Sequence, residues 1–488
     1  MKHLFCLCGV ICLLTGTSFA QDNLWMMGYY CCSATLGGMT MDVSASTPIV
    51  TSSNCPMNFS ATNAIISSPA GSLLFYTNGN YIGNRNYDTL LNGGGISPGY
   101  YAGLYNFSGQ PVQQGASILP FDFGHSPLYH LFHMAYDGTA PSSQPKSLYH
   151  SVIDMSLDSG RGAVVVKSDS LIQDTLTVGQ LTACRHANGR DWWLVLPKYN
   201  SNLYHILLIT PYEITDFPQQ IGPVIGWGEW SGQATFSPDG MRYVRYDREN
   251  GLTMMDFDRC TGLFSNPTHH GKSEFNDNAW GTGAAFSPNS NILYLSSFLY
   301  VYQFDLTAAN YFTTKTTVAV YDTSGYSFFT AELARNGKIY MIPTGGSNIM
   351  HVINYPDSLG MACNVVQHDS ILPRHNDGTI PHFPNFRLGP VDGSVCDSLV
   401  FENIPVPEHL AGNFQLFPNP ANRIAYITLP GFNNVDVRVI DILGRMQDVT
   451  ISIRSYLVEL DLSTLLPGCY SVVLGYEDSV LTRKLVKY

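Results

Sequence analysis

Short runs of aromatic and β-branched residues alternate with polar turns through the middle of the chain. The clearest examples are the turn 236–240 (FSPDG) leading into 241–244 (MRYV), and the turn 286–290 (FSPNS) leading into 292–295 (ILYL). In such turns proline fixes the first corner, Asp or Asn bonds back to its own backbone, and glycine takes the positive φ that closes a hairpin. The pattern therefore predicts β-hairpins.

This unit repeats at a nearly constant spacing. The turns end about 50 residues apart, at Gly189, Gly240, Ser290 and Gly337. Partner strands follow them at 203–207, 252–257, 300–306 and 349–353. Four-stranded units at this spacing are typical of β-propellers, which close on themselves and so protect the edges of their sheets. We predict an all-β protein with a propeller over residues 21–402, containing six to eight blades, with seven favoured.

A second domain is expected after residue 402. Residues 403–413 contain Pro405 and Pro407, which stiffen an extended linker. Beyond the linker, apolar and polar positions alternate in short segments such as 435–441 and 468–474. This alternation predicts a small Ig-like β-sandwich spanning residues 414–488.

Four motifs occur in order in this C-terminal segment: FPNPA at 417–421, VRVIDILGR at 437–445, LPGCYSVVL at 466–474 and RKLVKY at 483–488. Together they resemble the type A C-terminal sorting domain of type IX secretion substrates. The motif positions are Phe417, Pro418, Asn419, Pro420, Gly444, Arg445, Gly468, Tyr470 and Lys484.

The resemblance implies a secreted Bacteroidota protein that crosses the outer membrane after Sec transport. Its expected partners are the type IX secretion machinery and the sorting peptidase that removes the domain. The cargo is then either released or attached to surface lipopolysaccharide. An ordinary Ig-like domain at the C-terminus is the alternative interpretation.

The central region resembles the propeller-like cargo of many secreted Bacteroidota proteins. The similarity rests on the blade signatures FSPDG…YV at 236–244 and GAAFSPN…LY…YQFDL at 283–306. It implies a fold and no particular activity, because the same turn occurs in propellers of many functions.

The N-terminus has the features of a secretory signal peptide over residues 1–20. Lys2 supplies a positive charge, 4–14 is apolar, and small residues precede a cleavage site between Ala20 and Gln21. Lipidation is a rival reading because Cys6, Cys8 and Cys12 lie in the segment, but large residues precede each of them. We expect no transmembrane segment in the mature chain.

Composition narrows the possible partners. The chain has 25 Lys and Arg against 37 Asp and Glu, a net charge of −12. A surface of this sign repels nucleic acid and anionic lipid, so a nucleic-acid partner is not expected. Only 13% of residues are charged, which suits turn-rich β-structure outside the cell.

Eight cysteines remain after removal of the signal peptide, in an oxidising compartment. Short loops favour pairing of Cys363 with Cys396, and of Cys55 with Cys31 or Cys32. The alternative is that several are buried free thiols, because a hydrophobic core of this size is stable without disulfide bonds.

Signatures of common enzyme classes are missing from the sequence: G-x-S-x-G, H-E-x-x-H, a P-loop, an EF-hand and a dinucleotide fingerprint. We predict no catalytic residue, metal or cofactor. The histidines at 125, 130, 133, 269 and 270 are interpreted as structural, since no carboxylate lies at a spacing that fixes a shared metal. The acids at 154, 158, 256 and 258 are interpreted as turn-capping or solvated.

Four tryptophans are the candidates for a ligand platform: Trp192, Trp193, Trp227 and Trp230. Exposed aromatic rings in propeller loops stack on sugars or anchor a protein partner, although buried packing is the more common role. The working hypothesis is a non-catalytic binding or adhesion propeller at the cell surface, with a glycan or protein ligand. The alternative is a secreted propeller hydrolase or lyase acting on polysaccharide or peptide.

Overall fold

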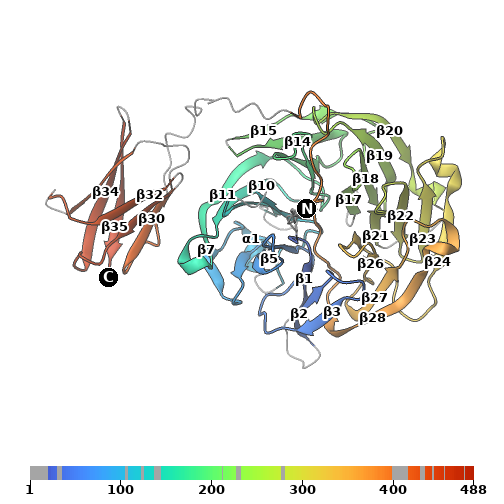
Figure 1. The fold of residues 1–488 in the computed structure, drawn as a ribbon, viewed down its shortest axis with the longest axis horizontal. Coiled ribbons are helices and arrows are strands. Elements are labelled where there is room, and N and C mark those ends of the chain that lie inside the picture. The colour runs from blue at the N-terminus through green and yellow to red at the C-terminus, as the bar shows by residue number, and fades with distance from the viewer. Residues whose placement is uncertain are drawn as a thin grey trace, which may run out of the picture.

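The computed structural model shows a ring of β-sheets and a smaller C-terminal β-domain (Figure 1). It describes residues 20–29, 36–104, 108–121, 126–136, 144–211, 213–226, 232–275, 281–397, 416–428, 435–441, 445–454, 457–476 and 479–488. Within these ranges, consecutive antiparallel strands form seven blades around the ring. The predicted all-β propeller is confirmed, with the favoured number of blades.

The first three blades are built from consecutive strands. They are β1 (Leu24–Tyr29), β2 (Gly37–Asp42) and β3 (Ile49–Ser52) in blade 1, β4 (Ala64–Ser67), β5 (Leu73–Thr77), β6 (Tyr81–Asn84) and β7 (Thr89–Gly94) in blade 2, and β8 (Ala116–Pro120), β9 (Leu128–Ala135), β10 (Ser147–Asp154) and β11 (Ala163–Gln173) in blade 3. Blades 2 and 3 share one eight-stranded sheet, because Ala163 of β11 pairs in parallel with Leu91 of β7.

Blades 4 to 7 follow the same meander. Their strands are β12 (Thr182–Arg185), β13 (Trp192–Pro197), β14 (Leu203–Ile209), β15 (Ile214–Asp216) and β16 (Gln219–Gln220), then β17 (Gly232–Phe236), β18 (Arg242–Asp247), β19 (Gly251–Phe257) and β20 (Phe264–His270), then β21 (Thr282–Phe286), β22 (Ile292–Ser297), β23 (Tyr300–Asp305) and β24 (Thr316–Val320), then β25 (Ala331–Leu333), β26 (Ile339–Met341), β27 (Ser347–Ile353) and β28 (Val365–Asn376). The helices are short: α1 (Tyr100–Leu104), η1 (Asp158–Gly160), η2 (Lys272–Glu274), η3 (Tyr311–Thr314) and η4 (Gly360–Cys363).

The repeated turns of the sequence join the innermost strand of a blade to the second strand. In blade 5, Asp239 Oδ1 accepts hydrogen bonds from the backbone N–H of Met241 at 2.9 Å and from the Ser237 hydroxyl at 2.5 Å. Gly240 closes this turn with a φ of 74°. The sequence therefore encodes each turn locally, through the side-chain hydrogen bonds that predicted it.

The hydrophobic core lies between neighbouring blades. One cluster joins Val244 and Leu252 of blade 5 to Ala284 and Leu295 of blade 6, and all four residues are buried. Alternate residues along each strand face one neighbour, so every blade buries both of its faces. This arrangement explains why the strands contain so few charged positions.

The ring closes by side-chain packing between the first and last blades. Trp25 of β1 and Tyr340 of β26 lie edge to face, with ring centroids 5.8 Å apart, in a cluster that also contains Met27 and Met350. Each described blade uses strands from one stretch of chain. Closure therefore depends on apolar contacts between blades 1 and 7, without an exchanged strand.

After β28 the chain turns back across the propeller. Residues 377–397, which we call the strap, run from blade 7 past the axis toward blades 4 and 5 (Figure 1). Phe383 in the strap contacts Trp25, and Phe386 contacts Trp192 on another blade. The strap thus links blades that are not neighbours in the ring.

The C-terminal domain contains two facing sheets. Its strands are β29 (Leu416–Phe417), β30 (Ile424–Thr428), β33 (Leu457–Asp461) and β32 (Thr450–Arg454) in one sheet, and β31 (Asp436–Asp441), β34 (Gly468–Tyr476) and β35 (Ser479–Lys487) in the other. Ile427 and Leu460 from the first sheet share a buried core with Val439 and Val472 from the second. The expected small β-domain is confirmed.

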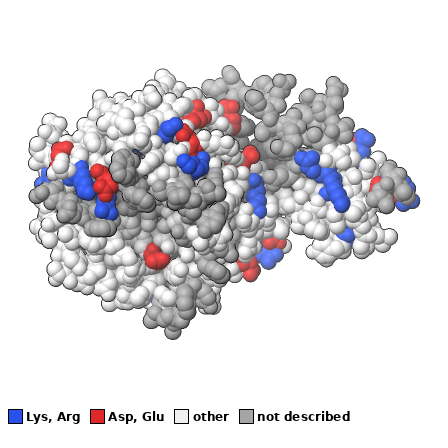
Figure 2. Space-filling view, turned by 180° about the vertical axis from the view of Figure 1, so that it is seen from behind, with Lys and Arg blue, Asp and Glu red and all other residues white. Residues whose placement is uncertain are grey.

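Charged side chains are sparse on the surface. The face shown in Figure 2 is mostly uncharged, with acidic and basic residues in small mixed groups and no extended basic patch on the propeller. None of the helices in the described part of the chain is both long and apolar enough to span a bilayer.

Candidate functional site

Trp192 of β13 is a core residue. Its side chain is 1% exposed, and the indole N–H donates to the carbonyl oxygen of Pro120 at 3.1 Å. The guanidinium carbon of Arg185 lies 3.8 Å from the centre of its ring, and Phe386 of the strap packs edge to face against it. Cation–π contact, ring packing and burial therefore commit this residue to the fold.

Trp193 is buried as well, with an exposed fraction of 2%, and its indole N–H donates to the carbonyl oxygen of Arg259 at 2.8 Å. The expectation that Trp192 and Trp193 form an exposed ligand platform is wrong, because successive strand residues here face buried blade interfaces on both sides. Trp227 and Trp230 fall outside the described residues.

The histidines packed in blade 3 have structural roles. His130 Nδ1 lies 2.9 Å from His150 Nε2, between the rings of Phe121 and Phe132. His133 Nε2 hydrogen-bonds to the carbonyl oxygen of Ile96 at 3.1 Å. Burial lowers the pKa of His133 to about 4 and that of His150 to about 3, and it holds the pKa of His130 well below its usual value.

The other candidate groups also serve local structure. His270 stacks on Phe312 and hydrogen-bonds Glu274 at 3.0 Å. The acids of the two pairs cap turns or bond neighbouring side chains, as expected: Asp154 with Ser156, Asp158 with Arg161, Asp256 with Asn266, and Asp258 with Cys260 and Thr261. His125 lies outside the described residues.

Near the propeller axis, the strap is held by a buried acid and an imidazole. His382 Nδ1 lies 2.9 Å from Glu332 Oε2, and the backbone N–H of Phe383 donates to Glu332 Oε1 at 3.2 Å. Burial raises the pKa of Glu332, and the hydrogen bond from His382 opposes that rise. Gln233 Nε2 lies 3.4 Å from the same imidazole, so three chain segments meet at His382.

The predicted start of the mature chain contacts blade 2 and the strap. Gln21 is 1% exposed and its carbonyl oxygen accepts from the N–H of Ser67 at 3.0 Å, while the N–H of Ala20 donates to Pro69. Asp22 forms an ion pair with Arg387 of the strap at 2.5 Å. Signal cleavage between Ala20 and Gln21 stays a prediction, and it would place the new terminus in contact with blade 2.

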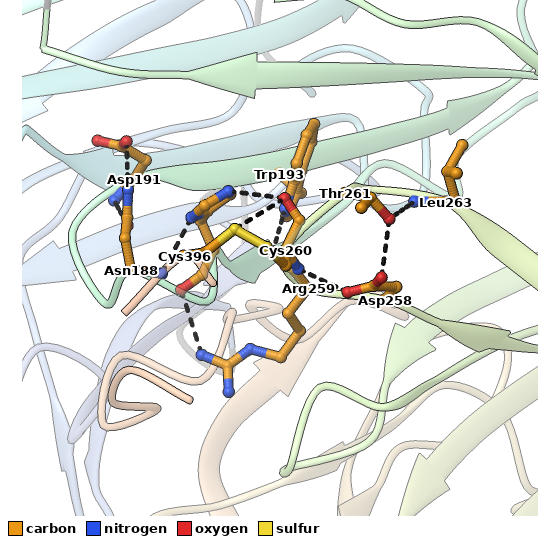
Figure 3. Close-up of a disulfide and its surroundings, with 10 residues drawn as sticks. Asn188, Asp191, Trp193, Asp258, Arg259, Cys260, Thr261, Leu263 and Cys396 are labelled. Carbon is orange, nitrogen blue, oxygen red and sulfur yellow. Dashed lines mark hydrogen bonds between the residues drawn. A yellow bond between two sulfur atoms is a disulfide. The ribbon is translucent and has the colours of Figure 1, made fainter. Parts of the chain in front are cut away.

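A disulfide fixes the far end of the strap. Cys396 is bonded to Cys260, which lies in the turn between β19 and β20, with the two Cα atoms 5.7 Å apart (Figure 3). Next to it, Arg259 Nε donates to the Arg185 carbonyl oxygen at 2.9 Å, and Arg259 Nη2 donates to Gly389 of the strap. The strap is therefore attached covalently and by charge-assisted hydrogen bonds.

The predicted cysteine pairs are wrong. Cys363 and Cys55 are buried free thiols, as is Cys184, so the alternative reading holds for these three. Cys363 packs in blade 7 against Tyr294, whereas Cys396 has already crossed to blade 5. Short sequence separation misled the prediction, because the strap carries Cys396 away from its neighbours in sequence. Cys31 and Cys32 lie outside the described residues.

A solvent-open cavity of about 350 Å³ lies against the outer strands of blade 2. Its wall consists of Pro56, which follows β3, together with Asn80, Tyr81, Tyr87, Thr89, Gly94, Gly95, Ser97 and Ala102. Every one of these side chains is uncharged. The volume is at the lower end of the range for small-molecule sites.

Tyr87 stands at the rim of the cavity in an unfavourable backbone conformation, with a φ of 69°. Left-handed φ values cost a non-glycine residue roughly 1–2 kcal/mol. The turn is maintained by Asn84, whose Oδ1 accepts from the N–H groups of Asn86 at 2.8 Å and Asp88 at 3.3 Å. The phenol ring packs against Tyr76, with centroids 6.4 Å apart.

The opposite rim is fixed by blade 3. Lys167 Nζ donates to the carbonyl oxygen of Gly94 at 2.5 Å. Two further donors hold the carbonyl of Ile96, two residues on: the Ser168 hydroxyl at 2.6 Å and His133 Nε2 at 3.1 Å. The cavity therefore has a rigid wall before any ligand arrives. The sequence offered no signal for this site beyond the tyrosines themselves.

In the C-terminal domain, Asn419 ties the FPNP motif to the last strand. Its Nδ2 donates to the Lys484 carbonyl oxygen at 2.6 Å, and its Oδ1 accepts from the N–H of Val486 at 2.9 Å. Phe417 is buried beside it, and Pro418 and Pro420 flank the amide. The asparagine thus replaces the edge pairing that the prolines cannot provide.

The remaining motif residues shape the other turns. The Tyr470 hydroxyl donates to the Leu466 carbonyl oxygen at 2.8 Å, just before β34 begins at Gly468. Arg445 Nε donates to Asp441 Oδ2 at 2.8 Å. Gly444 lies outside the described residues.

Comparison with known solved structures gives matches of low sequence identity, one of which is a β-propeller domain. A putative 6-phosphogluconolactonase from Bacteroides uniformis is 14% identical, with a TM-score of 0.44, 74% of this chain and 99% of that chain being covered. A putative TolB from Agrobacterium tumefaciens is 11% identical with a TM-score of 0.34, covering 76% of this chain and 95% of that one. The Cps50 (Swd1) β-propeller domain of Myceliophteria thermophila is 10% identical with a TM-score of 0.33, covering 63% and 89%.

No curated protein matches the chain. One family model does: residues 415–488 match the secretion system C-terminal sorting domain. This match covers the β-domain whose turns are described above and confirms the interpretation of its motifs. The chain is thus a β-propeller cargo joined to a type IX secretion sorting domain, which directs it to the cell surface or the medium.

Proposed function

We propose that the exported propeller is a non-catalytic binding or adhesion module that acts outside the cell. The observation that carries the proposal is the cavity on blade 2, which is open to solvent and lined by tyrosines and uncharged polar groups. Such a wall can recognise a ligand by stacking and hydrogen bonding. It offers no carboxylate or imidazole for proton transfer.

The folding roles of the candidate acids and histidines support a binding function. The catalytic alternatives, polysaccharide or peptide cleavage, need groups that are positioned for proton transfer or nucleophilic attack. His130, His133 and His150 are buried, and burial favours their neutral form. Glu332 is buried near the propeller axis, where His382 and the rest of the strap cover it.

The propeller and the sorting domain have separate tasks in this proposal. The type IX machinery recognises the sorting domain, and the sorting peptidase removes it. The propeller then meets its ligand either in the medium or while attached to surface lipopolysaccharide. Its few surface charges favour an uncharged ligand, such as a glycan, over nucleic acid.

The proposal is tested with the purified mature chain on an array of oligosaccharides and extracellular-matrix proteins. The same chain is incubated with soluble polysaccharides and casein, and the products are analysed by mass spectrometry. We expect saturable retention of at least one array ligand and no new product. Reproducible cleavage of a polysaccharide or peptide would overturn the proposal in favour of a hydrolase or lyase.

A further inference from the structure

The blade-2 cavity has the chemistry of a sugar-binding site, and this inference rests on the binding function proposed above. Pyranose rings present both apolar C–H faces and hydroxyl groups, so they bind where an aromatic ring and neutral hydrogen-bonding groups converge. Tyr81 and Tyr87 supply the rings, and Thr89 supplies an exposed hydroxyl in the same wall. Asn80 and Ser97 complete the neutral wall, but they are buried and bonded to Gln110 and Gly79.

We propose that this cavity binds a single neutral pyranose unit of a glycan, with Tyr87 as the aromatic contact and Tyr81 as a hydrogen-bonding partner. Both side chains are only partly buried. Neither phenol oxygen forms a hydrogen bond to another residue within the described ranges. Both hydroxyl groups are therefore available to a ligand.

The backbone of Tyr87 provides an independent argument. Glycine or asparagine is the usual residue at a left-handed turn position, because bulkier residues are strained there. Here a tyrosine occupies the position, and Asn84 holds the turn through its side chain. Strained backbone persists where the surroundings determine it, and such positions cluster at ligand-binding sites.

The ring is also preorganised. Tyr76 beneath it is 1% exposed, and it crosses β6 at Gly83, where a Cβ atom would lie 2.4 Å from the Tyr76 ring. Tyr87 packs on the edge of this fixed ring. On the other side, Lys167 and Ser168 hold the backbone at 94–96. A wall that is already ordered loses little conformational entropy on binding.

The absence of charge in the wall sets the ligand class. Acidic sugars are normally recognised by Arg or Lys pointing at the carboxylate. The ammonium group of Lys167, at the rim, donates to the carbonyl oxygen of Gly94. We therefore assign a neutral hexose or pentose in preference to a uronic or sialic acid.

The test combines binding and stability measurements on the mature chain and on Tyr87→Gly. Binding is measured by saturation-transfer NMR and titration calorimetry with methyl glycosides of glucose, galactose, mannose and xylose, and with neutral oligosaccharides retained on the array. Glycine removes the ring and relieves the positive φ. We expect at least a tenfold loss of affinity with an unchanged or higher thermal midpoint, which a merely structural tyrosine would not show.

Tyr355→Ala is the control, because Tyr355 is an exposed tyrosine that follows β27 of blade 7 and does not line the cavity. It should bind the same glycoside with wild-type affinity. If Tyr87→Gly binds as tightly as the wild type, the assignment of this cavity fails while the binding function stands. If the wild type retains only acidic glycans, the neutral class is wrong. If it retains no array ligand of any kind, both proposals fail together.

Discussion

Cys260 and Cys396 are joined by a disulfide although 136 residues separate them in sequence. The bond connects the outer turn of blade 5 to the end of the strap that began at blade 7. It therefore encloses blades 6 and 7 in a covalent loop. In the unfolded chain the same cross-link restricts a long segment, which is how disulfides stabilise folded proteins in the chain-entropy account.

Removing this bond should weaken the propeller. Cys396→Ser is expected to lower the free energy of unfolding by about 2–5 kcal/mol. The measurement is guanidinium denaturation of residues 21–488, with the sorting domain retained, under oxidising conditions and followed by tryptophan fluorescence. Cys469→Ser is the control, because Cys469 is an exposed free thiol in the sorting domain. Equal midpoints for Cys396→Ser and the wild type would contradict the structural role of the disulfide.

The strap requires glycine at one of the repeated turns. Gly240 has a φ of 74°, and a Cβ atom there would lie 2.7 Å from Arg259 Cδ and 2.9 Å from Leu388 of the strap. Gly337 occupies the corresponding turn of blade 7 with a φ of 80° and open space around it. Alanine at Gly337 should cost about 1 kcal/mol for the backbone alone.

Gly240→Ala should cost more, about 2–4 kcal/mol, because steric overlap adds to the same backbone term. The two variants are compared by urea denaturation, and the difference between them is the quantity of interest. If both variants lose the same stability, the expected steric overlap at Gly240 is absent.

The buried histidines make stability depend on pH. The folded protein keeps His133 and His150 neutral, with pKa values of about 4 and about 3, whereas an unfolded chain takes up protons below the ordinary value of 6.5. Stability is therefore full above pH 6.5 and falls as the pH decreases toward 4. At pH 5 the loss should reach about 2 kcal/mol for each histidine.

Urea midpoints at pH 7.5 and pH 5 measure this effect. His133→Asn keeps a donor for the Ile96 carbonyl but cannot be protonated, so it should reduce the difference between the two pH values. An unchanged difference in this variant would show that other groups, such as buried carboxylates, cause the acid sensitivity.

Trp192 should be a stability residue and not a binding residue. Trp192→Phe loses the hydrogen bond to Pro120 and leaves a small cavity beneath Arg185, so it should lower the free energy of unfolding by about 1–3 kcal/mol. Its affinity for any array ligand should equal that of the wild type. A selective loss of binding without a loss of stability would support the hypothesis that Trp192 belongs to a ligand platform.

Export should depend on the two hydrogen bonds by which Asn419 holds the FPNP motif to the last strand, which we call the Asn419 clamp. Asn419→Ala removes the partner of the Lys484 carbonyl and of the Val486 N–H, at a cost of about 0.5–1.5 kcal/mol for each hydrogen bond, since water can reach both groups. In a type IX-competent host we expect the variant to accumulate in the periplasm, as a chain truncated after Glu408 should. Fractionation with mass spectrometry of both termini is the measurement, with Gln21 the expected first residue.

Asn422→Ala is the matched control for that experiment. Asn422 lies in the same turn region, and among the described residues its side chain forms a hydrogen bond only with Lys487 Nζ, at 3.5 Å. The control should be exported normally. Normal export of Asn419→Ala would show that the machinery reads the domain without this clamp.

Local patterns were sufficient where one segment defines one element. Asp239 and Gly240 specify a hairpin turn from within five residues, and the spacing of such turns predicts blades. The sorting motifs lie within one small domain: Tyr470 bonds a backbone group four residues away, whereas Asn419 bonds the last strand of the same domain. The pattern was insufficient for Trp192 and Trp193, because ring stacking decides which strand faces are buried.

The sequence by itself determined the export route and the architecture: a C-terminal sorting domain, and a propeller of six to eight blades with seven favoured, both indicated by turns and alternating strands. Only the tertiary structure decided the partners of Cys396, the burial of the tryptophans and the cavity beside Tyr87. The physical reason is the distance along the sequence over which each interaction acts. Turn chemistry acts over a few residues, whereas disulfides, buried faces and cavities depend on segments brought together by closure of the ring.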